Sequence, residues 1–378
     1  ADNFERFLFF QKAVVRLIDV LELKPDLVHC NDWQAALIPM LLHYGIDGTI
    51  RDGSECTLMT VHNLAHHGWA PAEKFYMTNL PDSCYTMHTL EFYGEINMLK
   101  GGLVAATAIN AVSPTYAEEI KTPKFGCRLD GVLYHRRNVL HGILNGIDYK
   151  RWNPETDQYL PAHYSKENLD GKAVCKKALQ HGAGLLDDER TPLLGVISRL
   201  VPQKGIDLLA AAMERIVATG AQVIILGTGD RRHEEACREW ARCWPNQVSV
   251  WIEFSSQLAH QIEAGADIFL MPSEFEPCGQ NQMYSMRYGT IPVVHGVGGL
   301  EDSVIDYEKP GGTGFKFYGH TGDEFVDCID RALTVYADAP AWQTLMKRAM
   351  EQDFSVVHMA REYKELYEAI LSGNAAVD

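Results

Sequence analysis

The sequence predicts an α/β protein with two doubly wound, Rossmann-like domains. Short apolar segments of strand length alternate with segments whose apolar residues recur at helical spacing, which is typical of a mainly parallel sheet. The alternation occurs in two runs, with a polar, proline-containing stretch over 152–170 between them. A length of 378 residues fits two domains of about 150–200 residues each.

The first run opens with an amphipathic pattern that predicts a helix over 4–23. Four buried strands follow in this run, and helices separate them. The strands are predicted at 27–30, at 57–62, within 104–112 and at 139–144, and the helices at 33–44 and from Tyr116 to Ile120.

The second run repeats this pattern with five strands. They are predicted at 193–197, 223–226, 248–252, 268–271 and 291–294, with helices at 205–219 and 283–288. The last helix, over 356–371, is expected to pack back onto the first domain. The predicted domains are therefore 1–165 and 166–353, followed by a terminal segment over 354–378.

Composition excludes several classes of protein. A net charge of −16 argues against a nucleic-acid-binding protein, which normally presents a basic face. Nine cysteines without a C-x-x-C pair argue against a disulfide or zinc framework and favour a reducing compartment. No apolar run has the length of a membrane span, and no signal peptide is visible. We expect no membrane partner, and from the first residues, Ala-Asp-Asn, a processed chain or a fragment.

The notable polar residues follow the predicted strands. Carboxyl ends of parallel strands meet at one edge of a sheet, so we expect a ligand cleft there, between the two domains. The residues are His29, Asn31, Asp32, His62, Asn63, Ser113, Asn145 and Asp148 in the first run, and Ser198, Arg199, 227–230, 273–276 and 295–299 in the second.

The segment 274–299 is the most informative part of the chain. Glu276 follows a buried strand, and Pro277 suits the first position of a helix. The amides of Gly279, Gln280 and Asn281 would then point out of the helix N-terminus and form a cradle for anions and hydroxyls beside an acid. A helix-capping carboxylate is the alternative role for Glu276.

Several motifs, in order, cover the chain from about its first helix to nearly its last, and together they resemble the family of bacterial glycogen synthases and plant starch synthases. They are His29-Cys-Asn-Asp-Trp33, Thr60-Val-His-Asn63, Tyr93-Gly to Lys100-Gly-Gly102, Ala111-Val-Ser-Pro-Thr-Tyr116, Leu144-Asn-Gly-Ile-Asp148, Ser198-Arg-Leu200 with Gln203-Lys-Gly205, Phe275-Glu-Pro-Cys-Gly279 and Gly298-Gly-Leu300. The resemblance implies the GT-B fold and retaining transfer of glucose from ADP-glucose to an α-1,4-glucan, as in glycogen or starch synthesis. It also makes the first domain the acceptor side and the second the nucleotide-sugar-binding domain.

The resemblance implies catalytic roles for four residues. Arg199 and Lys204 would bind the departing ADP without a metal, and Glu276 would contact the glucose hydroxyls and balance positive charge at the reacting sugar. A solvated basic loop is the alternative for the two cations. His62 would lie over the transferred glucose, and a hydrogen-bonded core histidine is its alternative.

The remaining implied site residues contact either the acceptor or the donor. Asp32 and Trp33, followed along the chain by Asn63, resemble the acceptor side, although core packing is the favoured role for the indole taken alone. The donor side comprises Asn145, Asp148, Cys278, Gly279, Gln280, Asn281, Gly298 and Gly299. A turn explains Asn145 as well, and a buried filler explains Cys278. No metal and no cofactor is expected, because 227–230 lacks the full dinucleotide fingerprint and no histidine cluster has ligand spacing.

The chain departs from the family pattern in two ways. The family opens with a strand and a Lys-x-Gly-Gly-Leu loop that contacts the donor, and the first domain is expected to lack them, so we expect little activity from this segment. In addition, Glu274 stands where the family commonly has Arg, and Gln280 stands where it usually has Leu. A non-catalytic or inactive glucan-binding relative, and another GT-B sugar-nucleotide enzyme, are the alternatives. The residues leave open ADP- against UDP-glucose, glycogen against starch, the oligomeric state, and a bacterial cytoplasm against a plastid stroma.

Overall fold

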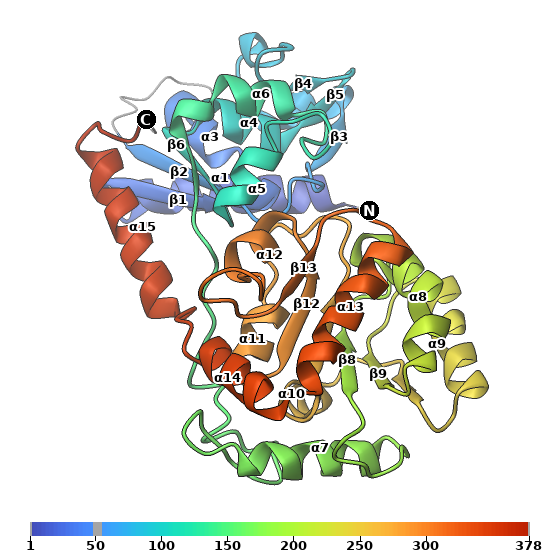
Figure 1. Ribbon diagram of the computed structural model, residues 1–378. Coiled ribbons are helices and arrows are strands. Elements are labelled where there is room, and N and C mark those ends of the chain that lie inside the picture. The colour runs from blue at the N-terminus through green and yellow to red at the C-terminus, as the bar shows by residue number, and fades with distance from the viewer. Residues whose placement is uncertain (1, 48–54, 377–378) are drawn as a thin grey trace. The chain divides into compact units, whose positions relative to one another are not determined.

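The computed structural model describes residues 2–47 and 55–376 and divides into two compact units (Figure 1). Unit 1 contains the described residues up to Leu144 together with those from Met359 onward, and unit 2 is Asn145–His358. Each unit has its own parallel sheet covered by helices, as predicted. None of the described helices combines the length and apolar character that a membrane span requires.

Unit 1 contains a four-stranded parallel sheet in the order β1-β2-β6-β7. Its strands are β1 (Leu27–Asn31), β2 (Cys56–Val61), β6 (Ala108–Ala111) and β7 (Leu140–Gly142), which confirms the four predicted strands. Residues 57–61 of β2 are all buried, as expected for a parallel strand that helices cover on both faces.

The helices of unit 1 follow the predicted pattern with one break. They are α1 (Asn3–Val20), α2 (Asp32–Ala35), α3 (Ile38–Tyr44), α4 (Met98–Ala105), α5 (Pro114–Glu119) and α6 (Asp130–His135). The single helix predicted over 33–44 is wrong, because the chain breaks between α2 and α3. Pro39 has no N–H to continue the helix, and the N–H of Leu37 donates instead to Oε1 of the buried Gln11, at 2.5 Å.

Sequence patterns did not indicate a small antiparallel sheet in unit 1. It has the order β3-β5-β4, with β3 (Trp69–Pro71), β4 (Glu91–Phe92) and β5 (Glu95–Asn97). Short 3₁₀ helices at Ala72–Thr78, Asp82–Cys84 and Arg137–Val139 complete the unit. Strands of two or three residues are too short to show an alternating apolar pattern.

The terminal helix α15 (Val356–Leu371) packs against the sheet of unit 1. Leu366 and Ile370 are buried in a cluster with Leu58 of β2. The hydroxyl of Tyr367 lies 2.8 Å from Nδ1 of His29, whose Nε2 lies 2.7 Å from Oγ1 of Thr60. The helix is therefore fixed by apolar packing and by a partly buried hydrogen bond between Tyr367 and His29.

His29 makes the stability of unit 1 depend on pH. Burial, with a smaller effect of the nearby His62, lowers the pKa of His29 to about 4, below its ordinary value. The His29 side chain therefore takes up a proton near pH 6.5 in the unfolded chain, but only near pH 4 in the folded chain. We expect the free energy of unfolding to fall as the pH falls through this window, and to level off below it.

Urea unfolding of the wild type and of His29→Gln at a series of pH values checks this expectation. The variant lacks the titrating group, so its unfolding free energy should depend less on pH in this window. Equal slopes for the two proteins would assign the pH dependence to other groups.

Unit 2 contains a six-stranded parallel sheet in the order β10-β9-β8-β11-β12-β13. Its strands are β8 (Leu193–Ile197), β9 (Gln222–Leu226), β10 (Val248–Trp251), β11 (Ile268–Met271), β12 (Ile291–His295) and β13 (Phe315–Phe317). This is the doubly wound order of a Rossmann fold, and the strand order reverses between β8 and β11. The five predicted strands are confirmed, whereas the three-residue β13 was missed.

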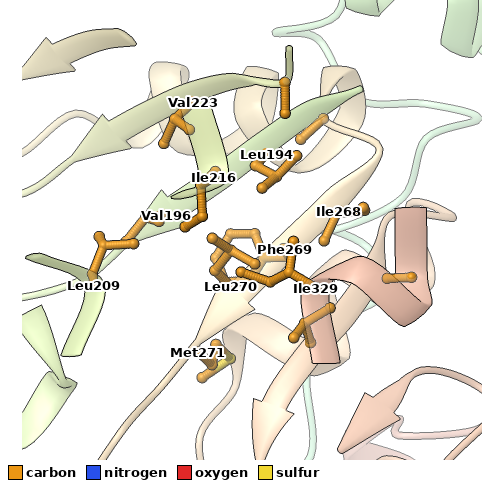
Figure 2. Packing of buried hydrophobic residues seen from close by; sticks show 14 of the residues in the cluster. Leu194, Val196, Leu209, Ile216, Val223, Ile268, Phe269, Leu270, Met271 and Ile329 are labelled. Atoms are coloured by element: carbon orange, nitrogen blue, oxygen red, sulfur yellow. The ribbon is translucent and has the colours of Figure 1, made fainter. Parts of the chain in front are cut away.

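Helices cover both faces of this sheet and enclose the larger core. They are α7 (Asp170–Gly182), α8 (Ile206–Ala218), α9 (Arg231–Cys243), α10 (Ser256–Gly265), α11 (Asn281–Arg287), α12 (Gly298–Ser303), α13 (Gly322–Tyr336) and α14 (Ala339–Met350), with a 3₁₀ turn at Pro202–Lys204. Figure 2 shows side chains of β8, β11 and α8 meeting in the core, among them Val196, Phe269 and Ile216.

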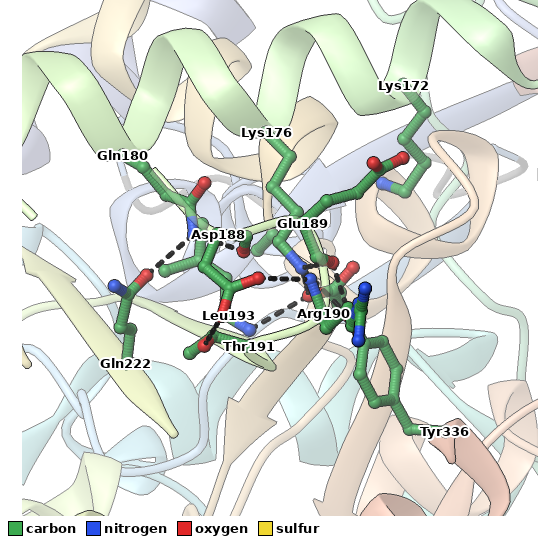
Figure 3. Close-up of polar contacts among 12 residues, drawn as sticks. Lys172, Lys176, Gln180, Asp188, Glu189, Arg190, Thr191, Leu193, Gln222 and Tyr336 are labelled. Carbon is green, nitrogen blue, oxygen red and sulfur yellow. Dashed lines mark hydrogen bonds and ion pairs between the residues drawn. The ribbon is translucent and has the colours of Figure 1, made fainter. Parts of the chain in front are cut away.

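A buried polar network secures the amino ends of β8 and β11 (Figure 3). Nζ of Lys176 on α7 lies 2.7 Å from Oδ2 of Asp267 and donates to the hydroxyl of Tyr336 at 2.9 Å. The same Oδ2 accepts the N–H of Leu193, at 2.9 Å. These bonds hold the central strands at the end of the sheet that carries no predicted site residue.

The segment that follows Leu144 belongs to unit 2, so the predicted domain boundary at residue 165 differs from the observed division. The indole of Trp152 lies between His260 and Tyr284, with ring centroids 3.7 and 3.9 Å away. Oδ2 of Asp157 lies 2.6 Å from Nδ1 of His260. The sequence places the polar, proline-containing stretch over 152–170 between the two runs, but its aromatic and acidic side chains pack into unit 2.

Candidate active site

Lys204 and Glu276 form an ion pair at the point of unit 2 where the strand order reverses. Lys204 follows β8 and Glu276 follows β11, and Nζ lies 2.5 Å from Oε2. Oγ of Ser273 donates to the same Oε2 at 3.2 Å. The Glu276 side chain is only 7% exposed, so Lys204 and Ser273, rather than water, must stabilise its negative charge. Ligands of doubly wound sheets bind at this position.

The loop that carries Lys204 can approach Glu276 because Gly205 has no side chain. Gly205 has φ of +70°, and a Cβ atom there would lie 2.0 Å from the carbonyl oxygen of Pro272. Two hydrogen bonds hold the loops together. The N–H of Glu274 donates to the carbonyl of Gln203 at 2.9 Å, and Nε2 of Gln203 donates to the carbonyl of Phe275 at 3.3 Å.

Arg199 adds a second cation next to the pair. It follows β8, is exposed, and Nη2 lies 3.5 Å from Oε1 of Gln203. A guanidinium with one weak contact keeps most of its donors for an anionic ligand. The structure thus places two cations and a buried carboxylate at the carboxyl ends of β8 and β11.

The expected helix start at Pro277 is wrong, because α11 begins at Asn281 with Gln280 as its N-terminal cap. Glu276 is therefore not a capping residue. Pro277 to Gly279 form a loop in which Gly279 has φ of +68°. Among the described residues, no hydrogen-bond acceptor is assigned to the N–H groups of Gly279 and Gln280. The loop, rather than a helix N-terminus, presents these donors.

The glycine pair at 298–299 brings a second loop against the first. A Cβ at Gly299 would lie 2.2 Å from the carbonyl oxygen of Cys278. The N–H of Gly299 donates to the carbonyl of Glu276 at 3.1 Å, so this amide is occupied. Gly298 has φ of +44° at the start of α12. The close approach of the two loops accounts for Gly299, and the positive φ accounts for Gly298.

The other predicted donor-side residues have structural contacts in unit 2. Nδ2 of Asn281 donates to the carbonyl of Ile197 at 2.7 Å, and Nε2 of Gln280 to that of Gly146 at 3.4 Å. Oδ1 of Asp148 accepts the N–H of Lys150 at 2.8 Å.

Cys278 and Asn145 are in contact in the same region. Burial raises the pKa of the Cys278 thiol to about 12, and a hydrogen bond with the backbone of Asn145 opposes this shift. A thiol with this pKa is inert at neutral pH, which agrees with a buried filler.

In unit 1, His62, Asn31 and Asp32 meet at the carboxyl ends of β1 and β2. The backbone N–H of His62 donates to Oδ1 of Asp32 at 2.8 Å. The ring Nε2 of His62 lies 2.9 Å from Oδ1 of Asn31. Asp32 has φ of +54°, a conformation that costs energy for a residue with a side chain. Asp32 therefore orients the backbone of His62.

Trp33 and Asn63 have local contacts in unit 1. A Cβ at Gly68 would lie 2.5 Å from the Trp33 ring, and Phe7 packs edge-on against that ring at 4.8 Å. These contacts fix the position of the indole, which is only partly buried. Oδ1 of Asn63 accepts the N–H of Ala65 at 3.0 Å, which closes a turn.

Three residues that sequence patterns did not single out are further candidates for the site. Phe254, after β10, is 94% exposed, although aromatic residues are seldom so open. Gln282 and Ser303 are buried beside the two loops of unit 2. An aromatic residue just after a strand was a visible signal for Phe254, whereas no sequence signal separates Gln282 and Ser303 from core residues.

Comparison with known proteins identifies the family. Residues 1–135 match the family model described as starch synthase catalytic domain, and residues 182–343 match glycosyl transferases group 1. A glycogen synthase from Anaeromyxobacter sp. is 46% identical over 98% of this chain and 78% of its own length. A glycogen synthase from Thermotoga maritima is 45% identical over 97% of this chain and 76% of its own length.

Solved structures agree with these relatives. The catalytic domain of starch synthase IV from Arabidopsis thaliana, bound to ADP and acarbose, matches with a TM-score of 0.90 and 34% identity, over 98% of this chain and 78% of that one. Sucrose-phosphate synthase from Thermosynechococcus elongatus shares the fold, with a TM-score of 0.61 and 19% identity, over 98% of this chain and 80% of that one. The chain therefore belongs to the glycogen synthase and starch synthase family, and has the GT-B fold.

Proposed function

We propose that the protein transfers glucose from ADP-glucose to the non-reducing end of an α-1,4-glucan, with retention of configuration. The observation that carries this proposal is the Lys204–Glu276 pair at the carboxyl ends of β8 and β11. Relatives named glycogen synthase, and a starch synthase structure with bound ADP, support this reaction and this donor. Nine free cysteines and bacterial relatives support a cytoplasmic location.

In this reaction, the bond between the glucose and the diphosphate breaks, and negative charge develops on the leaving phosphate. Lys204 uses one of its three N–H donors on Glu276, so the others remain for the diphosphate. Arg199 and the loop amides of Gly279 and Gln280 supply further donors. Donors fixed in place before the reaction stabilise this charge without reorganisation.

Glu276 balances the positive charge that develops on the reacting sugar. Its carboxylate is fixed by Lys204 and Ser273, and it is too buried to be screened by solvent. We assign His62, held by Asp32, to the transferred sugar, and assign unit 1 to the acceptor glucan. Asn145 and Asp148 are proposed as further contacts on the donor side.

Phe254 is the candidate platform for the adenine base. It follows β10, and the N–H of Gly227 after β9 donates to the carbonyl of Trp251 at 3.0 Å, so the two strand ends are adjacent. Stacking of a base on an aromatic ring contributes about 1–3 kcal/mol. Phe254→Ala is therefore expected to raise the KM for ADP-glucose about tenfold with little change in kcat.

Steady-state kinetics with varied ADP-glucose check the role of Phe254. Phe254→Trp should restore the affinity, and Tyr76→Ala, at another exposed aromatic residue in unit 1 (76% exposed), is the control. An unchanged KM in Phe254→Ala would place the base elsewhere.

The proposed reaction is tested by incubating the protein with maltoheptaose and either ADP-glucose or UDP-glucose. The lengths of the products and the configuration of the new linkage are then measured by electrophoresis and proton NMR. We expect octaose and longer products with α-1,4 linkages, formed faster from ADP-glucose. Faster transfer from UDP-glucose would identify UDP-glucose as the preferred donor. Binding of glucan without transfer would favour a non-catalytic glucan-binding role.

A further inference from the structure

Two loops of unit 2 form the donor side of the proposed site, and neither is part of a strand. The first, over 276–280, carries Glu276 and the amides of Gly279 and Gln280, which have no acceptor within 2–47 and 55–376. The second, over 296–299, leads into the first residues of α12 and packs against the first at Gly299. Loops without a strand hydrogen-bond ladder need other contacts to hold the geometry that catalysis requires.

Buried side-chain hydrogen bonds connect these two loops. Nε2 of Gln282 on α11 donates to the carbonyl of Cys278 at 3.1 Å and to Oγ of Ser303 on α12 at 3.0 Å. Oγ of Ser303 in turn donates to the carbonyl of Gly299 at 2.5 Å. Gln282 is completely buried and Ser303 is 3% exposed, so water does not compete for these bonds. We call this chain of hydrogen bonds the loop relay.

The loop relay sets the direction in which a backbone N–H points in the proposed diphosphate site. A trans peptide group points its C=O and its N–H in opposite directions. The carbonyl of Cys278 is held by Gln282, so the N–H of Gly279 in the same peptide group points away from Gln282. That N–H is one of the two amides to which no acceptor is assigned among the described residues.

The orientation of the Gln282 amide is determined by its surroundings. Nε2 faces two acceptors, and a reversed amide would bring Oε1 against the carbonyl oxygen of Cys278. Oε1 is buried and has no hydrogen-bond partner among the described residues, and it lies 2.6 Å from the position that a Cβ at Gly279 would take. The amide therefore packs directly beneath the loop that it orients.

We propose that Gln282 and Ser303 are positioning residues that hold the two loops in the geometry that binds the donor diphosphate. This inference rests on the proposed function of the site. Neither residue needs to touch the ligand, because each acts on a backbone carbonyl of the loops. Loss of the relay should therefore raise the Kd for the nucleotide, while the loss of stability should be no larger than for another buried hydroxyl.

The test compares Ser303→Ala with Ser285→Ala. Ser285 is a completely buried serine of α11 whose Oγ donates to the carbonyl of Gln282 at 3.0 Å, so its removal deletes the same group without touching either loop. Both variants lose one buried hydroxyl and should lose similar thermal stability. Only Ser303→Ala should raise the Kd for ADP, measured by calorimetry, and the KM for ADP-glucose, each about tenfold or more.

A second variant, Gln282→Glu, removes both donated N–H groups at nearly constant shape and should weaken ADP binding at least as much. Ser303→Thr keeps the hydroxyl and should restore the Kd. Wild-type Kd values for ADP in both Ser303→Ala and Gln282→Glu would contradict the positioning role. An equal rise of this Kd in Ser285→Ala would contradict it as well. Failure of the wild type to bind ADP would instead count against the proposed function.

Discussion

Replacing Glu276 with glutamine is expected to lower kcat by at least about 100-fold, with a much smaller change in the Kd for ADP. Glutamine keeps the shape of the side chain and an acceptor for Nζ of Lys204, which lies 2.5 Å from Oε2. The change removes the negative charge, and that charge acts mainly on the transition state. Such an effect lowers kcat without a matching loss of ground-state binding.

Glu274→Gln is the matched control for this variant. Glu274 is two residues upstream on the same loop, is exposed, and stands where the family commonly has Arg. The control should leave kcat nearly unchanged, since an exposed charge is screened by water. Rates of glucose transfer under saturating donor and glucan check both variants, and a Glu276→Gln protein with wild-type kcat would remove Glu276 from the chemistry.

Replacing Gly205 with alanine is expected to cost at least about 3 kcal/mol of unfolding free energy and to abolish most of the activity. An added Cβ would lie 2.0 Å from the carbonyl oxygen of Pro272, a backbone atom that cannot rotate away. The loop of Lys204 must then move from the strand end that carries Glu276. Both the fold and the ion pair depend on this close approach.

Gly220→Ala separates the two causes of this loss. Gly220 also has a positive φ, +85°, but no atom lies within 4 Å of an added Cβ. Its alanine variant should lose only about 1 kcal/mol of unfolding free energy, the cost of a positive φ for a residue with a Cβ, and should keep full activity. Urea unfolding and transfer rates of the two variants give the comparison, and equal losses would show that crowding at Gly205 is unimportant.

Much of the fold could be predicted because buried parallel strands leave a strong local signal. The segments that became β8, β9 and β11 are short apolar runs bounded by polar turns, and their order along the chain implies a parallel sheet. Arg199 and Glu276 were also expected to follow strand ends, and they follow β8 and β11. Both inferences depend on neighbours in sequence.

Other features depend on contacts between distant segments, and these could not be predicted. Pro277 suits a helix start, yet α11 begins only at Asn281, because the packing of Gly299 against Cys278 holds the intervening residues as a loop. Likewise, the loop relay joins Gln282 to Ser303, which is 21 residues further on. Nothing in the local sequence marks such a pair.

The most direct test of the proposed function measures the incorporation of radiolabelled glucose from ADP-glucose into glycogen by the wild type and by Glu276→Gln. If the Lys204–Glu276 pair is the centre of glucosyl transfer, the wild type will label glycogen at a rate at least about 100-fold above the variant, while both proteins bind ADP. Equal incorporation by the two proteins, at a measurable rate, would contradict that role.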